Sequence, residues 1–415
     1  MMMEQYQPAG SPSPENTGSS PLRAWLAVGS VTIGAFAFVT TEFLPVGVLP
    51  QVARDLGVTP GTAGLMVTIP GVIAAISAPG MMLGAGRLDR RHILLMLSVL
   101  LLASNLISAF ASTFDLMLLG RAMLGASLGG FWTLALAAAG RLVRPHEAAR
   151  ATAMILAGVT CATVIGVPLG TFIAGLASWR ASFMATGVLV AIALGAQALL
   201  IPALPSSAAL RFADLVALWR RAVPRKSLLM VALVFGAHFS SYTYIAPFLL
   251  QNASFSVSSI TWLLLGFGIV GFVSNFAFSA MVTRNLKASL ATVVVLLMLA
   301  LSTMPLLRHS EPAVMITVLV WGIAFGAIPL CLSVWMQLVT SDLPEAGSAL
   351  FVGMIQVAIA VGSMVGGTMV DRVGIPADFW FGSALALLGL AALASFGAIG
   401  ARSAEAELTA QVRVE

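Results

Sequence analysis

The chain consists of long apolar runs, and its charged residues fall almost entirely in the short gaps between them. Twelve such runs can be distinguished, each close to the roughly 20 apolar residues that an α-helix needs to cross a bilayer. Unbroken apolar runs fit helices, whereas the strands of a membrane barrel alternate apolar and polar residues. The pattern predicts an all-α polytopic membrane protein with spans at about 25–48, 62–83, 93–111, 116–139, 152–176, 181–201, 228–250, 260–282, 290–306, 313–339, 347–370 and 379–399.

The composition excludes a water-soluble domain. Hydrophobic residues make up 59% of the chain and charged residues 9%, and the mean hydropathy is +1.00. Soluble domains carry about 25% charged residues. The net charge of +5 is spread over many loops, so we expect no nucleic-acid partner. The two cysteines lack metal-ligand spacing, and we expect neither a metal nor a cofactor.

The runs form two groups of six, separated by a longer and more polar connector. Proteins with two such bundles bind their substrate between the halves, near the middle of the membrane. The connector includes a basic amphipathic stretch at 210–221, which suits the membrane surface. The predicted parts are a disordered cytoplasmic tail (1–22), an N-terminal six-helix bundle (23–201), the cytoplasmic connector (202–227), a C-terminal six-helix bundle (228–400) and a cytoplasmic tail (401–415).

The basic residues predict the orientation. With the N-terminus inside, sixteen Lys and Arg residues fall in inner loops and tails and four in outer loops, with Arg121 left in the membrane. Inner loops of membrane proteins are enriched in Lys and Arg. We therefore expect a multi-pass protein of the bacterial inner membrane with both termini in the cytoplasm.

Glu42 is the one acidic residue that the sequence places deep in an apolar run. An ionisable group at membrane depth is costly and marks a functional site by default. Burial and a nearby cation shift a carboxyl in opposite directions, so Glu42 is a candidate for taking up a proton on one side and releasing it on the other. The alternative is a helix-end residue wetted by the outer headgroups, because Pro45 and Pro50 follow closely.

Arg121 lies at a depth similar to that of Glu42, about two helical turns into its span if Asp115 marks the outer end. A buried pair with Glu42 is therefore compatible with the spacing. The alternative is an arginine that extends its charged end toward the outer surface.

Several motifs give the chain a family resemblance. The loop after the second span contains Gly84, Asp89, Arg90 and Arg91, and resembles the inner-loop signature of the major facilitator superfamily. The fourth span resembles that family's intramembrane arginine motif, at Arg121, Gly125 and Gly129. In the fifth span Gly166, Pro168 and Gly170 resemble the antiporter signature, with Val167 inserted between the usual glycine and proline.

The resemblance implies function as well as fold. The chain is similar to bacterial drug:proton antiporters, above all to members that export purine ribonucleosides; exporters of arabinose-type sugars or chloramphenicol share much of the pattern. The resemblance implies proton coupling through Arg121. It also implies that the inner-loop motif is a charge clasp that holds the halves together when the cavity faces outward. A role in limiting proton leak is implied for the antiporter motif, although packing is the default role of its small residues.

Polar and aromatic residues inside the spans are candidates for the substrate cavity. The segment His238 to Tyr244 is the densest in such groups, which would suit a purine and a ribose or an aromatic drug. Single aromatic residues in a span more often serve packing or the membrane interface, and His238 is equally compatible with packing. The candidates are Asn105, Phe131, Trp132, His238, Tyr242, Tyr244, Asn275, Trp335 and Gln356.

Absent motifs narrow the function. The sequence contains no phosphate-cradling loop and no hydrolase-like arrangement of Ser, His and Asp, which disfavours an ATP-driven pump or an enzyme. We expect a monomeric secondary transporter in the lipid bilayer whose partners are a small-molecule substrate and protons. A receptor that binds without transport and a passive uniporter are the other hypotheses.

Overall fold

The structure is a computed structural model that describes residues 21–84, 88–204 and 212–396. Most of the two expected tails lies outside these residues, as do Arg87 and part of the connector. Twelve helical stretches in the described part of the chain are long and apolar enough to cross a membrane, and the regular structure there is helical. The predicted all-α architecture with twelve spans is therefore confirmed, and the chain is a multi-pass membrane protein.

The first six spans form one half of the molecule, the N-half, and two of them are irregular. The second span begins with a single helical turn, and the fifth contains a π-helical turn. The elements of the N-half are α1 (Pro21–Asp55), α2 (Pro60–Ala63), α3 (Leu65–Gly84), α4 (Arg90–Ala109), α5 (Phe114–Leu142), η1 (Pro145–Glu147), α6 (Ala148–Cys161), η2 (Ala162–Gly166), α7 (Val167–Leu176) and α8 (Trp179–Leu200).

The last six spans form the C-half. Its first span is broken at Thr243 and Tyr244, between α10 and α11. The connector contributes α9 (Phe212–Arg220), which packs against α10 and α15. The elements of the C-half are α10 (Ala222–Tyr242), α11 (Ile245–Gln251), α12 (Val257–Val282), α13 (Leu286–Thr303), α14 (Glu311–Val339), α15 (Pro344–Arg372) and α16 (Ile375–Ala394).

Local sequence signals explain where several helices begin. A Ser or Thr side chain at the position before a helix can accept a hydrogen bond from an otherwise unpaired N–H of the first turn. Thr113 does this for α5, Ser178 for α8 and Ser256 for α12. Gly374, at a φ of 120°, makes the turn into α16, a backbone conformation that favours glycine. These signals place the helix ends where the apolar runs stop.

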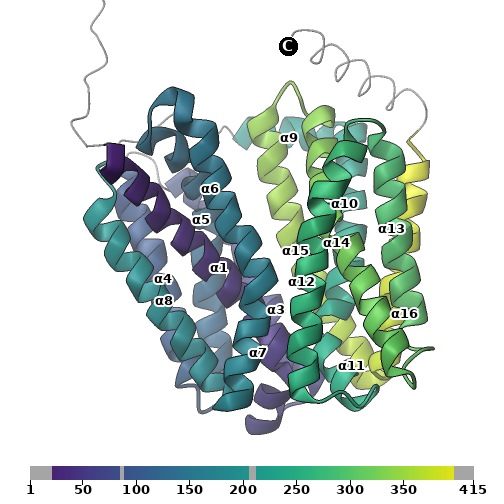
Figure 1. Cartoon of the computed structure of the whole chain (residues 1–415). Coiled ribbons are helices and arrows are strands. Elements are labelled where there is room, and N and C mark those ends of the chain that lie inside the picture. Colours follow the sequence, from purple (N-terminus) through teal and green to yellow (C-terminus); the bar gives the residue numbers. More distant parts are fainter. Residues whose placement is uncertain (1–20, 85–87, 205–211, 397–415) are drawn as a thin grey trace, which may run out of the picture.

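The two halves are seen side by side in Figure 1, the N-half in purple to teal and most of the C-half in green to yellow. We call the end of the molecule at which α1 stops the Asp55 end, and the opposite end, at which α4 begins, the Arg90 end. In Figure 1 the halves approach each other most closely at the Asp55 end and diverge toward the Arg90 end.

Hydrogen bonds join the halves at the Asp55 end. The carboxylate of Asp371, the penultimate residue of α15, accepts from Thr59 Oγ1 at 2.6 Å and from the Gly61 N–H at 2.9 Å. The hydroxyl of Tyr244 donates to the Ser363 carbonyl at 2.8 Å and lies 3.4 Å from the Gly61 carbonyl. Tyr244 thereby bridges the break in the seventh span and the start of the second.

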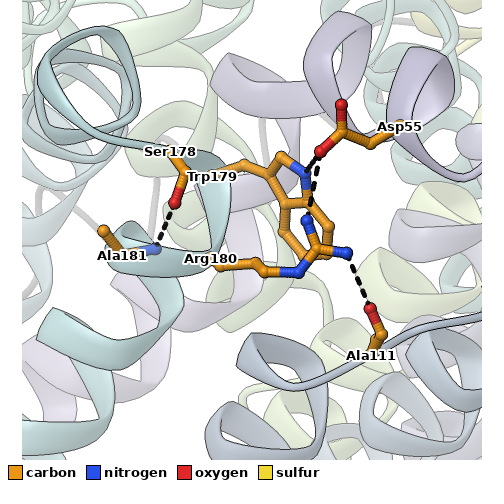
Figure 2. Close-up of polar contacts among 6 residues, drawn as sticks. All are labelled: Asp55, Ala111, Ser178, Trp179, Arg180 and Ala181. Atoms are coloured by element: carbon orange, nitrogen blue, oxygen red, sulfur yellow. Dashed lines mark hydrogen bonds and ion pairs between the residues drawn. The ribbon is translucent and has the colours of Figure 1, made fainter.

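A polar cluster within the N-half fixes the Asp55 end of that bundle (Figure 2). Asp55 Oδ2 accepts from Trp179 Nε1 at 2.8 Å and from Arg180 Nη1 at 3.1 Å. Arg180 also donates to the carbonyl of Ala111 at 3.0 Å and lies over the Trp179 ring. Three elements, α1, α8 and the loop before α5, are thus tied together by Asp55 and Arg180.

Candidate functional site

Arg121 is fully buried in α5 and binds three backbone carbonyls. Its Nε donates to the Met66 carbonyl at 2.7 Å, its Nη1 to the Thr41 carbonyl at 2.7 Å and its Nη2 to the Glu42 carbonyl at 2.9 Å. Charge-assisted hydrogen bonds of this kind are stronger than neutral ones. The guanidinium therefore holds α5, α1 and α3 together at membrane depth.

Two of these carbonyls are left without a helical partner by prolines. In an α-helix a carbonyl accepts from the N–H four residues later, and proline has no N–H. Pro45 follows Thr41 by four residues, and Pro70 follows Met66 by four. Arg121 thus supplies donors to two carbonyls that their own helices cannot satisfy, which gives both prolines a reason to lie inside spans.

The carboxyl of Glu42 points toward the other half. Its side chain is 6% exposed, and Oε1 accepts from Gln356 Nε2 of α15 at 3.3 Å. The ion pairs within the described residues are Arg180–Asp55 and Arg221–Asp342, so Arg121 contacts the backbone of Glu42 instead of its carboxylate. A carboxyl at the interface between the halves, near a buried cation but not directly paired with it, is placed where it can respond to a change in their relative position.

The residues around Glu42 and Arg121 form a packed layer. Asn105 of α4 is buried and donates to Thr41 Oγ1 at 3.0 Å, next to the carbonyl that Arg121 binds. Phe43 stacks on Phe239 of the C-half, with ring centroids 5.5 Å apart. A methyl group on Gly71 of α3 would come within 2.8 Å of the Gln356 carbonyl. The backbones of α3 and α15 therefore approach closely beside the carboxyl, as small residues in membrane helices allow.

The inner-loop motif lies at the Arg90 end and bonds within the N-half. Gly84 is the last residue of α3. Asp89 caps α4, accepting from the Arg91 N–H at 2.8 Å, and also accepts from the Leu204 N–H at 2.8 Å. Arg91 donates to the Ala198 carbonyl at 2.7 Å, and the Arg90 N–H donates to the Leu204 carbonyl. The contacts described for this motif thus tie α4 to the end of α8.

Asp89 makes a capping contribution that depends on pH. Desolvation raises the pKa of its carboxyl, but the N–H groups of Leu204 and Arg91 and the charges of His92 and Arg91 hold it below its ordinary value. We expect Asp89→Ala to lower the free energy of unfolding by about 1 kcal/mol near neutral pH. Because a lowered pKa stabilises the fold above the ordinary carboxyl value, this difference should shrink as pH falls below about 4. Unfolding in SDS measures it.

Asp115→Ala is the matched control for this prediction. Asp115 is an exposed residue in the first turn of α5, where Thr113 is the capping side chain. Its replacement should change stability by less than half as much. A stability difference for Asp89→Ala that stays constant down to pH 3 would contradict the assignment of the cap to an ionised carboxyl.

The glycine-rich motifs line helix contacts. A methyl group on Gly125 would come within 2.5 Å of the Pro70 carbonyl, and one on Gly129 within 2.7 Å of the Ala74 carbonyl, so α5 lies directly on α3. Gly166 and Gly170 face Thr40 and Leu44 of α1 in the same way, and Pro168 is buried beside them. These residues bring the backbones close enough for the bonds that Arg121 makes.

The nine cavity candidates separate into groups. Phe131, 0% exposed, stacks on Phe38, and Trp132 meets its edge. Asn275 donates to the Gly326 carbonyl, and Trp335 bonds Ser227 at the Arg90 end of the C-half. Asn105, Gln356 and Tyr244 belong to contacts already described. His238 and Tyr242 lie together in a cluster of rings, so only part of the predicted set is brought together.

We call this group of rings the aromatic cluster; its members are His238, Tyr242, Phe267, Trp321 and Phe325. His238 Nδ1 accepts from Trp321 Nε1 at 3.1 Å, which leaves the hydrogen on Nε2. His238 is 0% exposed, and its Nε2 has no hydrogen-bond partner. A buried donor without a partner among flat rings is a feature that a nitrogen-rich aromatic ligand can satisfy.

A cavity of about 360 Å³ lies elsewhere, between the halves at the Asp55 end. Polar side chains of Gln51, Arg54 and Asp55 line it on the α1 side, and Leu250 and Val257 line it on the C-half side. None of the nine sequence candidates lines this cavity.

Sequence reasoning missed a second buried carboxyl. Glu42 is the one acidic residue that the sequence places deep in an apolar run, but the structure also buries Asp378, which lies at a helix start and is 0% exposed. Asp378 follows Gly374 and Pro376, a turn signal that assigns it to a helix end, and only the packing of α10 and α15 over that end buries it. The prolines four residues after Thr41 and Met66 were the available signal for the Arg121 contacts.

Comparisons with known proteins cover most of the chain. The model of the Major Facilitator Superfamily matches residues 31–352. The purine ribonucleoside efflux pump NepI of Salmonella paratyphi B is 33% identical over 364 residues, which cover 88% of this chain and 92% of that protein. The same pump of Salmonella enteritidis matches equally well.

Solved structures share the fold at low sequence identity. The nucleoside transporter NupG aligns with a TM-score of 0.73 and 14% identity, covering 89% of this chain and 100% of that one. The D-xylose-proton symporter aligns with a TM-score of 0.70 and 16% identity, covering 91% and 98%. Both alignments span the two halves and support the twelve-helix architecture.

Proposed function

This chain belongs to the Major Facilitator Superfamily, and we propose that it exports a purine ribonucleoside or a related drug-like compound from the cytoplasm in exchange for protons. It is a membrane transporter, as its relatives and structural neighbours are, and they are not enzymes. The proton coupling, the substrate and the location in the bacterial inner membrane are parts of the proposal. So are a monomeric state and cytoplasmic termini.

The single observation that carries the proposal is the position of Glu42. Its carboxyl is almost fully buried between the halves, next to Arg121 and in contact with Gln356. A proton on this carboxyl removes a buried charge, and movement of the halves changes the contact with Gln356. The two events are therefore linked, which is what an exchange of protons for substrate requires.

The contacts between the halves support alternating access. Asp371 and Tyr244 close the Asp55 end, while the inner-loop motif at the Arg90 end bonds within the N-half. By the positive-inside rule the Arg90 end faces the cytoplasm. We propose that this conformation is closed to the outside, and that the clasp around Asp89 joins the halves in the opposite conformation.

The aromatic cluster supports a ligand with a flat heterocycle. Its rings offer faces for stacking, and His238 Nε2–H is a donor that lacks a partner. A purine base has ring nitrogens that accept such a bond, and burying a donor without an acceptor is unfavourable. We propose that the base stacks on this cluster beside Tyr242 and Phe267, each of which is 7% exposed in this conformation.

Flux into liposomes tests the proposal. Purified protein is placed in vesicles whose interior is more acidic than the bath, so that outward proton movement drives substrate inward. We expect inosine to accumulate above its bath concentration, by up to about tenfold per pH unit for one proton per substrate. A protonophore should abolish the accumulation.

The same assay separates the other hypotheses. Accumulation of arabinose or chloramphenicol in place of inosine would identify a sugar or drug exporter. Inosine flux that ignores the pH gradient would identify a uniporter, and binding without flux a receptor. Any of these results contradicts the proposed exchange of a purine ribonucleoside for protons.

A further inference from the structure

Asp378 is a buried carboxyl that the proposed transport cycle does not yet use. It lies in the first turn of α16, at the Asp55 end of the C-half, and its residue is 0% exposed. Neither carboxylate oxygen has a hydrogen-bond partner within the described structure. Buried carboxylates in proteins are normally paired or hydrogen-bonded, because an isolated buried charge is very costly.

The surroundings of Asp378 contain acceptors. A methyl group placed on Gly366 of α15 would come within 2.7 Å of Asp378 Oδ1 and within 2.8 Å of the Ser240 carbonyl, so these two oxygens border the same small space. The hydroxyl of Ser241 donates to the backbone carbonyl of Asp378, at 3.4 Å, and not to its carboxyl. A protonated carboxyl can donate to a carbonyl in such a space, whereas a carboxylate would face it with no donor.

No Lys, Arg or His side chain of the described residues forms an ion pair with Asp378. The broken seventh span contributes Tyr244 and, one to two turns earlier, His238; the end of α15 contributes Asp371 and Arg372. Arg372 is exposed, and His238 is engaged with Trp321. On α13, Lys287 lies at the Arg90 end, where it bonds the Phe396 carbonyl. The ion pairs within the described residues do not include Asp378.

We propose that Asp378 is a second proton-binding carboxyl, which takes a proton from the outer side and must carry it for the Asp55 end to close. This inference rests on the alternating-access cycle proposed above. The proton is bound and released without any change of covalent bonds other than the carboxyl O–H. In the closed conformation the neutral acid fits a space bordered by carbonyl oxygens in which no described donor bonds the carboxyl, and the ionised form requires water or a donor that an open Asp55 end admits.

The contact between Asp378 and the closing elements makes this link direct. Gly366 neighbours Asp378 on one side, and the next residue, Gly367, lies against both the Tyr244 hydroxyl and the Gly61 carbonyl of the N-half. Tyr244 bonds Ser363 one turn earlier on the same helix. Opening the Asp55 end moves Tyr244 and α15 away from Gly61, and so loosens the packing that seals Asp378.

The direction of this coupling suits an exporter. A transporter open to the outside should return to the inside only after a proton has replaced the substrate. If closure needs a protonated Asp378, an outward-open protein without that proton cannot close. Asp378 would thus act as a checkpoint at the outer side, distinct from Glu42 at mid-depth.

Distances between the halves test the proposal without any substrate. Spin labels are attached to cysteines at Ser112, in the loop before α5, and at Ser258, in the first turn of α12. Both positions are exposed, and the background is Cys161→Ser. Distance distributions are recorded in lipid nanodiscs between pH 5 and 9. We expect the ratio of open to closed Asp55 ends to rise with pH, by at most tenfold per pH unit for one proton.

Asp378→Asn is the decisive variant, because the amide is neutral at every pH and brings its own donor. We expect it to remain closed, with an open-to-closed ratio at pH 8 at least fivefold below that of the parent protein, and to lose most of the pH dependence. The comparison is repeated in a Glu42→Gln background, so that titration of Glu42 does not contribute. SDS unfolding verifies that Asp378→Asn is as stable as the parent, which separates a locked protein from a misfolded one.

Two outcomes overturn the proposal in different ways. If Asp378→Asn opens with the same pH dependence as the parent protein, Asp378 does not control closure, although alternating access stands. If the parent never shows an open Asp55 end at any pH or with inosine present, the proposed cycle fails and the checkpoint fails with it.

Asp371→Asn serves as a comparison: it removes an outer contact, so it should raise the open fraction at every pH while preserving the pH dependence.

Discussion

Replacing Glu42 by Gln is expected to abolish proton-driven accumulation of substrate while leaving substrate binding largely intact. The side chain keeps its size and its contact with Gln356 of α15, but it can no longer gain or lose a proton. In vesicles with an acidic interior, the ratio of internal to bath inosine should fall to one, whereas exchange of labelled for unlabelled inosine without a gradient should persist within about tenfold of the parent rate.

The matched control is Glu345→Gln, the same substitution at an exposed position at the start of α15. It should accumulate inosine like the parent protein. Full accumulation by Glu42→Gln under the same pH gradient would exclude Glu42 as the coupling carboxyl. Loss of both accumulation and exchange would instead indicate that the residue is needed for binding or for movement of the halves.

The fold was predictable because the bilayer leaves few alternatives. Apolar runs of helical length and the polar gaps between them correctly predicted twelve spans in two groups. What the runs could not show is where a span is broken or bent. The interruption at Thr243 and Tyr244 lies inside the single span predicted at 228–250. Pro247 lacks the N–H that would bond the Thr243 carbonyl, and Tyr244 packs against Gly61 and Ser363.

The candidate site was predictable where it depends on single ionisable residues, which are energetically unfavourable inside an apolar span. Glu42 and Arg121 stand out in any apolar run, and the structure places their helices in contact. The contact itself is different from a simple ion pair, since the guanidinium binds carbonyls. Asn105 and His238 are both polar residues inside spans, but the tertiary structure places them in different contacts. Asn105 donates to Thr41 of α1, whereas His238 belongs to the aromatic cluster.

The second large effect is expected at Arg121. Arg121→Met leaves two buried carbonyls, those of Thr41 and Met66, without a donor, and each unsatisfied buried group costs about 1–3 kcal/mol. We expect the free energy of unfolding in SDS to fall by about 3 kcal/mol or more and proton-driven export to be lost. Arg121→Lys keeps the charge but not the planar fork of donors, so export should fall at least tenfold with a smaller loss of stability. Arg284→Met, in an exposed loop, is the matched control.

Restoring the helical donors separates the two tasks of Arg121. Pro45→Ala and Pro70→Ala each return an N–H at the position from which the Thr41 and Met66 carbonyls would normally receive a hydrogen bond. Added to Arg121→Met, they should recover about 1–2 kcal/mol of the lost stability, whereas export should stay absent because no positive charge remains near Glu42. A triple variant no more stable than Arg121→Met would show that the carbonyls freed by proline are not what the guanidinium satisfies. Recovery of proton-driven export by that variant would show that Arg121 holds helices together and takes no part in coupling.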